Sequence, residues 1–229
     1  AGSLNDLGPW RPDGRVLTGT GRTRTVQVSA PAGATFEYKF TLGTWEREAL
    51  SATGVVPPNN RLMLSRDTVV AHEIAQFKKD VREYVADWRG SGVLGRLVYW
   101  PDVRSTFLGS PSDRLVEIWL PPGYDSSTTT RYPVLYMHDG QNLFDPRIAS
   151  TGTDWGVDEA IMRLVKRGVM PPVIVVGVWN SARRGAEYSP WRDAPQYARF
   201  MIEELMPHVN ATFRTLTGPQ NTATMGSSM

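Results

Sequence analysis

The chain has 229 residues, 41% of them hydrophobic and 21% charged, with a formal net charge of +2, as expected for a globular protein of one large or two modest domains. Its basic residues are scattered, which argues against a nucleic-acid partner, and no apolar run approaches the roughly 20 residues that span a bilayer, so we expect no membrane association. The absence of cysteine excludes disulfides, thiolate metal ligands and cysteine nucleophiles.

The first part of the chain, residues 1–88, has the pattern of a β-sandwich. Residues 25–28 and 35–40 alternate in side-chain character, and turns rich in Gly and Pro separate such runs. Residues 68–70 favour another strand, and the stretch 72–88 that follows is predicted to be irregular or helical.

The second part, residues 113–229, has a different pattern, because apolar strands alternate with amphipathic helices. This alternation predicts a parallel α/β sheet. One helix is expected to begin at Asp154, which can cap it, and to end near Gly168. Residues 89–112 are predicted to form a loop-like linker between the two parts. The expected strands cover residues 115–120, 133–137, 173–178 and 222–225, and a second helix carries Tyr197, Phe200, Met201 and Leu205 on one face.

The chain ends on Gly226-Ser227-Ser228-Met229, the first four positions of a Gly-x-Ser-x-Gly nucleophile elbow. Such an elbow places a serine on a tight strand-to-helix turn with its hydroxyl exposed. The tetrapeptide is a weak signal alone, but the strand predicted before it favours Ser228 as a nucleophile over a surface turn. The acid and the histidine that follow the serine in such folds have no counterpart in these residues. We therefore expect a fragment, without efficient ester hydrolysis by residues 1–229 alone.

The stretch from His138 to Asn142 follows a buried strand and is the second candidate element. In folds with a nucleophile elbow, a loop after an early strand supplies one backbone N–H of the oxyanion hole, and the residue after the nucleophile supplies the other. Here these donors would be the backbones of Gln141 and Met229. An ordinary turn, which Asp-Gly favours, explains the stretch equally well.

The chain has three histidines, His72, His138 and His208, and all precede Ser228. His138 is expected at the same sheet edge as the serine, so it could approach it, but a structural role in its loop is favoured. The histidines and the acidic residues show no HExxH-like spacing. We therefore predict no metal ion and no cofactor.

Trp45 is the best candidate for ligand binding in the first part. A tryptophan face can stack on a sugar ring, and Lys39 or Asn60 could add polar contacts. Packing of Trp45 inside the sandwich is an equally good explanation.

Residues 113–229 resemble the esterase D-like family, which contains feruloyl, acetylxylan and enterochelin esterases, S-formylglutathione hydrolases and mycolyltransferases. The resemblance implies an α/β-hydrolase fold whose C-terminal part is missing here, with Ser228 as nucleophile and Gln141 and Met229 as oxyanion donors. The matching stretches are residues 120–124, 132–142, Arg184 with 187–190, 203–205 and 225–229.

The first part resembles, more loosely, a starch-binding or immunoglobulin-like β-sandwich, through residues 36–40, 44–46 and 60–61. Together the two resemblances imply a serine carboxylic-ester hydrolase acting on a small-molecule or carbohydrate ester, with a secreted or periplasmic location favoured. An acyltransferase of the same fold, a non-catalytic carbohydrate-binding protein and an inactive fragment remain as alternatives. The oligomeric state stays open.

Overall fold

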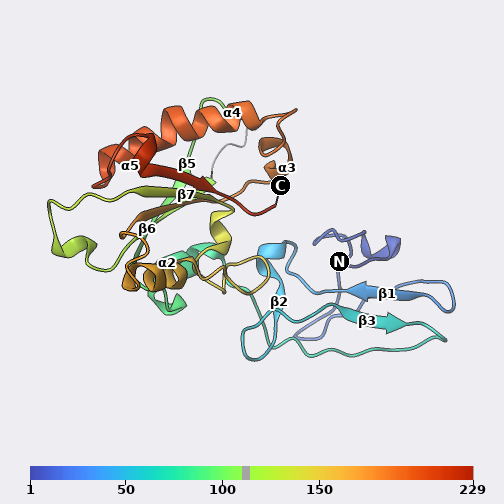
Figure 1. The fold of residues 1–229 in the computed structure, drawn as a ribbon. Coiled ribbons are helices and arrows are strands. Elements are labelled where there is room, and N and C mark those ends of the chain that lie inside the picture. Colours follow the sequence, from blue (N-terminus) through green and yellow to red (C-terminus); the bar gives the residue numbers. More distant parts are fainter. Residues whose placement is uncertain (110–113, 229) are drawn as a thin grey trace. The chain divides into compact units, whose positions relative to one another are not determined.

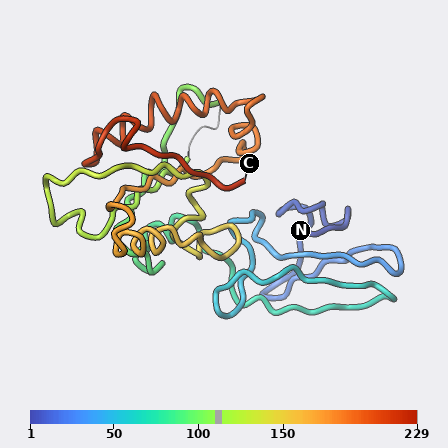
Figure 2. The backbone as a smooth tube through the Cα atoms, in the orientation of Figure 1, coloured from blue at the N-terminus to red at the C-terminus, as the bar shows by residue number. Residues whose placement is uncertain are grey.

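The computed structural model describes residues 1–109 and 114–228. The chain divides after Ala86 into two compact units, shown as a ribbon in Figure 1 and as a backbone tube in Figure 2. This division lies close to Trp88, the expected end of the sandwich. Among the described residues, no helix combines the length and the apolar character that crossing a bilayer requires.

The N-terminal unit contains two small antiparallel sheets. Strand β1 (Thr35–Tyr38) pairs with β3 (Asn60–Met63), and β2 (Ala49–Leu50) pairs with β4 (Gln76–Phe77). Helix α1 (Val81–Ala86) follows. The sandwich assignment therefore stays a prediction. Short 3₁₀ turns cover Asn5–Leu7 and Trp45–Arg47.

Two strands expected in this unit are absent from the structure. Within residues 25–28, Thr25 forms a single isolated bridge with Thr18, and residues 68–70 have no regular structure. Val69 is 96% exposed. Both predictions were wrong because a run of β-forming residues becomes a strand only where a neighbouring strand accepts its backbone hydrogen bonds.

The C-terminal unit is built on one five-stranded sheet in the order β5-β6-β8-β7-β9. Strands β7 and β8 are parallel, as are β7 and β9, whereas β5 and β6 pair antiparallel with each other and β6 pairs antiparallel with β8. The sheet is therefore mixed, which corrects the parallel sheet that the sequence predicted. The strands are β5 (Arg96–Val103), β6 (Arg114–Leu120), β7 (Val134–His138), β8 (Ile174–Val178) and β9 (Thr222–Met225).

Strand β5 contradicts the predicted linker over residues 89–112. It lies inside that segment and pairs with β6 from Arg96 opposite Leu120 to Val103 opposite Arg114, with a register shift after Trp100. Pro101 concealed the strand, because proline is rare in a sheet interior and is tolerated at edges and bulges. A 3₁₀ turn, Trp88–Ser91, precedes it, and residues 110–113 of the predicted linker lie outside the described residues.

Helices cover both faces of the sheet (Figure 1). Helix α2 (Val157–Lys166) packs on one face, and a continuous helical segment packs on the other; it comprises α4 (Ala194–Arg199), a π-helical turn (Phe200–Leu205) and α5 (Met206–Thr212). Strand β8 contributes to both cores, which explains its unbroken apolar run. The first core includes Leu97, Trp119, Met137, Val157, Ile161 and Val175, and the second includes Val116, Ile118, Tyr136, Val176, Phe200 and Leu205.

The predicted start of α2 needs one correction. The residue in the N-cap position is Gly156, and the Asp154 carboxylate accepts a hydrogen bond from the Gly156 N–H at 3.1 Å without capping the helix itself. The predicted helix end is confirmed, since Gly168 has φ +67°, a left-handed conformation that glycine adopts readily. Further short elements are α3 (Arg184–Glu187) and 3₁₀ turns at Tyr124–Ser126, Gly140–Asn142 and Pro219–Asn221.

Candidate active site

The candidate site lies at the carboxyl edge of β7 and β9. These strands are parallel neighbours, with Met137 of β7 opposite Met225 of β9. Because the carboxyl ends of parallel strands meet at one sheet edge, the stretches 138–142 and 226–228 begin side by side. The structure thus brings together the two segments that carry the predicted catalytic residues.

Ser228 follows β9 by three residues and is exposed. Its φ is +61°, a left-handed conformation that is uncommon for a residue other than glycine. Strained backbone of this kind is typical of functional turns, and the serine of a nucleophile elbow sits on a strained turn. The conformation at Ser228 therefore has the character that the motif predicts.

The loop after β7 also has an unusual backbone. Asp139 has φ +56°, and the next residue, Gly140, packs directly on β8. A Cβ atom on Gly140 would lie 2.6 Å from the carbonyl carbon of Gly177, so only glycine fits there. The 3₁₀ turn of residues 140–142 thus approaches β8 closely and presents Gln141 at the sheet edge.

Of the two predicted oxyanion donors, Gln141 lies in this turn and Met229 lies outside the described residues. The Gln141 side-chain oxygen accepts a hydrogen bond from the backbone N–H of Asn180 at 3.3 Å. That contact fixes the turn to the segment after β8, so the backbone of Gln141 is held in place at the sheet edge.

Asp139 anchors the loop through a charged network. Arg184 of α3 donates two hydrogen bonds to its carboxylate, at 2.7 and 2.8 Å, and the Asn180 amide donates a third at 2.7 Å. Burial alone would raise the pKa of Asp139, but the hydrogen bonds from Arg184 and Asn180 lower it below its usual value. Paired hydrogen bonds from a guanidinium hold a carboxylate in one orientation. The charge of Asp139 therefore stabilises the loop.

A buried ion pair lies between β6 and α3, the helix that begins with Arg184. Arg114 of β6 and Glu187 of α3 are 0% and 1% exposed and lie 2.8 Å apart. The Ser181 hydroxyl donates a further hydrogen bond to Glu187 at 3.0 Å. This pair joins α3 to the sheet. In the sequence, Glu187 belongs to a stretch that carries the family resemblance, and no local pattern indicates its partner.

The three histidines lie in different surroundings. His138 contacts hydroxyl groups with both ring nitrogens, Nδ1 with Tyr197 at 2.9 Å and Nε2 with Thr224 at 3.3 Å. Burial lowers the pKa of His138, and the neighbouring Asp139 partly offsets this. His72 belongs to the N-terminal unit and contacts the Tyr38 hydroxyl, and the exposed His208 packs against Trp100. Only His138 lies at the candidate site.

Among the residues that the structure describes, one acidic group has the spacing of a metal site. Asp154, Asp158 and Glu159 place carboxylate oxygens within 4.8 Å of one another at the start of α2. Buried Asp158 accepts a hydrogen bond from the Leu94 N–H at 2.7 Å, and burial raises its pKa to about 7. Acidic side chains are favoured at a helix N-terminus, so the group is explained without an ion.

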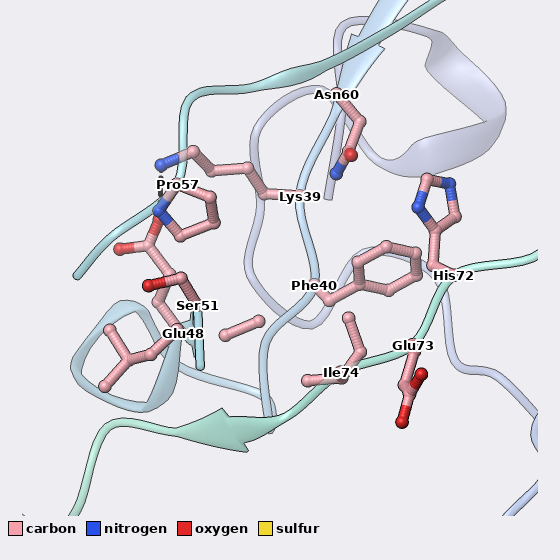
Figure 3. Close-up of a pocket in the computed structure, with 11 residues that line it drawn as sticks. Lys39, Phe40, Glu48, Ser51, Pro57, Asn60, His72, Glu73 and Ile74 are labelled. Carbon is pink, nitrogen blue, oxygen red and sulfur yellow. Dashed lines mark hydrogen bonds and ion pairs between the residues drawn. The ribbon is translucent and has the colours of Figure 1, made fainter. Parts of the chain in front are cut away.

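A second candidate site is a cavity of about 170 Å³ in the N-terminal unit. Two of the three predicted ligand contacts, Lys39 and Asn60, line it (Figure 3). The Lys39 ammonium forms an ion pair with Glu48, and the Asn60 amide donates to the carbonyl of Tyr38 at 3.3 Å. Trp45 is not among the lining residues. Its ring lies 6.5 Å from that of Trp10, so Trp45 does not share this cavity with the other two.

The solved structures most like this chain include two ferulic acid esterases. One is 24% identical, with 60% of this chain and 50% of the other aligned and a TM-score of 0.45. The second, from the anaerobic fungus Anaeromyces mucronatus, is 21% identical over 59% and 50%, with a TM-score of 0.42. The enterobactin esterase of Shigella flexneri is 18% identical over 59% and 31%, with a TM-score of 0.43. The chain therefore spans half or less of the length of these proteins.

No curated protein sequence matches the chain. A family model described as "Putative esterase" matches residues 109–229, which is more than half of the chain and includes both the 138–142 loop and the elbow. The chain belongs to this esterase family.

Proposed function

We propose that the protein is a serine carboxylic-ester hydrolase of the α/β-hydrolase fold, with Ser228 as its nucleophile. The observation that carries this proposal is the left-handed backbone of Ser228, three residues after a strand whose parallel neighbour leads into the loop of Gln141. Membership of the esterase family supports the reaction class.

In the proposed reaction, the Ser228 hydroxyl attacks the ester carbonyl and gives its proton to a base. The tetrahedral intermediate collapses by breaking the bond to the alcohol oxygen, which takes the proton back from the base and leaves as the alcohol, and an acyl-serine remains. Water then attacks the acyl group and releases the acid. The backbone N–H groups of Gln141 and Met229 would stabilise the negative oxygen of each intermediate. In this fold the base is ordinarily a histidine that follows the serine in chain order.

The substrate is proposed to be a small-molecule or carbohydrate ester. The cavity in the N-terminal unit, to which Lys39 and Asn60 contribute polar groups, supports a sugar-binding role for that unit. Saturable binding of a soluble glucan that Asn60→Ala weakens at least tenfold, and that Trp45→Ala leaves unchanged, would support the cavity as the binding site. The reverse pattern would support stacking on Trp45.

The test of the ester-hydrolase proposal is hydrolysis of an activated aryl ester by the protein from its natural source, compared with its Ser228→Ala variant. We expect the variant to lose at least about 10³-fold in kcat, since removing a nucleophile leaves only binding and oxyanion stabilisation. Ser227→Ala is the matched control and should retain most of the activity. Full activity in Ser228→Ala would refute the proposal. Products formed with an added acceptor alcohol distinguish hydrolysis from acyl transfer.

A further inference from the structure

We infer that His138 is a positioning residue, which holds strand β9 and the serine turn against the helical layer. The inference rests on the proposed role of Ser228. It makes the structural role that the sequence favoured for His138 specific, and it differs from the alternative in which His138 is the general base.

The first support is that one imidazole ring bridges two elements. His138 is the last residue of β7; its Nδ1 contacts the Tyr197 hydroxyl of α4 at 2.9 Å, and its Nε2 contacts the Thr224 hydroxyl of β9 at 3.3 Å. Strand β9 ends the sheet order and pairs only with β7 among the described strands. The ring therefore adds side-chain contacts to the backbone pairing of β9 with β7.

The second support is the close approach of the ring to Gly226. A Cβ atom on Gly226 would lie 3.3 Å from Cδ2 of His138 and 3.7 Å from its Cβ. The first distance is tighter than ordinary van der Waals contact and the second is ordinary contact, so the backbone two residues before Ser228 runs directly along the imidazole. The motif requires a small residue at Gly226, and the imidazole of His138 is the neighbour that leaves little room for a larger one.

The third support is that neither ring nitrogen of His138 is free to accept the proton of the serine. A general base needs a nitrogen lone pair within hydrogen-bond reach of the serine hydroxyl. In His138 both nitrogens face other hydroxyls, those of Tyr197 and Thr224. Rotation toward Ser228 would break the bridge between α4 and β9. The ring therefore acts on the serine through the backbone of β9.

Further neighbours restrict the ring on its buried side. The rings of Tyr188 and Tyr197 each lie 5.5 Å from the imidazole, and the adjacent Asp139 is paired with Arg184. Tyrosine and threonine hydroxyls can each donate or accept, so the bridge persists with either tautomer of the neutral ring. The bridge is thus a packing and hydrogen-bonding feature that needs no charge on His138.

The experiment combines amide hydrogen exchange at Thr224 and Met225 with the rate at which a fluorophosphonate labels Ser228. His138→Phe keeps an aromatic ring and removes both hydrogen bonds. We expect it to speed exchange of the two amides at least tenfold and to slow labelling at least tenfold. His138→Gln, which can still reach one hydroxyl, should recover part of both. His208→Phe, on the exposed histidine that packs on Trp100, is the matched control and should change neither.

Two results would overturn the inference. Exchange and labelling within twofold of wild type in His138→Phe would show that the bridge does not hold β9. Loss of labelling with unchanged exchange would instead make His138 the base. Should His138→Phe fail to fold, Thr224→Val removes the same bridge from the exposed side, with the same expectations. If wild type is not labelled at Ser228, the proposed function fails, while the exchange readout still tests the bridge.

Discussion

The two units differ most in how much apolar surface they bury. Among the described residues, the N-terminal unit buries four apolar side chains, Leu7, Phe36, Ala49 and Leu50, whereas the C-terminal unit buries 27. The C-terminal sheet is covered on both faces, so its central strands can bury successive side chains, as β8 does at all of its positions. The two-stranded sheets of the N-terminal unit cannot do so. The candidate catalytic residues therefore lie in the unit with the larger hydrophobic core.

Each unit also contains a buried ion pair, and the pair in the C-terminal unit is the more completely buried of the two. In the N-terminal unit Glu48 lies between Lys39 and Lys78, and Lys39 retains 18% exposure. In the C-terminal unit Arg114 and Glu187 are almost completely enclosed. Removing one partner of an enclosed pair leaves an uncompensated charge, which costs more than leaving a charge that can reach water.

The largest effect is expected for Glu187→Ala, which should lower the free energy of unfolding of the C-terminal unit by about 3–5 kcal/mol, since Arg114 would remain buried and unpaired. Glu48→Ala in the N-terminal unit should cost less, because Lys39 can turn to solvent and the buried Lys78 lies 3.8 Å from Glu48, a longer contact than that between Arg114 and Glu187. Urea denaturation followed by circular dichroism measures both. Glu203→Ala, which breaks an exposed pair with Arg199, is the control and should cost less than about 1 kcal/mol. Equal losses of stability in Glu187→Ala and Glu203→Ala would contradict the expected difference between an enclosed and an exposed ion pair.

The next largest effect is expected for Gly140→Ala, because its Cβ atom would lie 2.6 Å from the backbone of Gly177. Overpacking of this kind typically costs about 1–3 kcal/mol. Gly185→Ala in α3 is the matched control, since a Cβ atom there meets nothing within 4 Å. It should be neutral or stabilising, because alanine favours helix. Thermal unfolding of the two variants distinguishes them, and a stable Gly140→Ala would contradict the close approach of the loop to β8.

A smaller, pH-dependent effect is expected for Asp158→Asn. Burial raises the pKa of Asp158 to about 7, above the unfolded value near 4, so the folded chain retains a proton that the unfolded chain has lost. The contribution of this group to stability therefore falls as the pH rises from about 4 through 7. The variant cannot ionise, and its Tm relative to wild type should rise by at least about 2 °C between pH 5 and pH 8. A constant difference would contradict the burial of an ionisable group here.

The smallest effects are expected in amide exchange of the unmodified protein. Amides of β1 and β3 should exchange through openings of lower free energy than those of β7 and β8, because fewer buried contacts hold them. Exchange measured by NMR or mass spectrometry compares the two pairs of strands directly. Equal protection would show that the amount of buried apolar surface does not determine which unit opens at lower free energy.

The sequence predicted the C-terminal unit well where local pattern and packing agree. The strands over residues 115–120, 133–137, 173–178 and 222–225 are confirmed as β6 to β9, with small changes at their ends. Strand β5 was missed because Pro101 interrupts its pattern at a bulge on the sheet edge. In the N-terminal unit, local pattern did not show which segments would find a partner strand.

The candidate site was predictable only in part, for the same reason. The motif at Ser228 and the loop of Gln141 are contiguous in sequence, so they could be recognised and assigned to one sheet edge. The pair of Arg114 with Glu187 joins residues 73 positions apart, and no local signal connects them. The contacts of His138 with Tyr197 and Thr224 likewise depend on the completed sheet.

The central claim is that Ser228 is the nucleophile. Its most direct test is peptide mass mapping of the protein from its natural source after reaction with a fluorophosphonate, alongside the intact mass of the untreated chain. The account predicts a single stoichiometric adduct on Ser228, with loss of ester hydrolysis in proportion to labelling. An adduct on another residue that abolishes hydrolysis, with Ser228 unmodified, would contradict it.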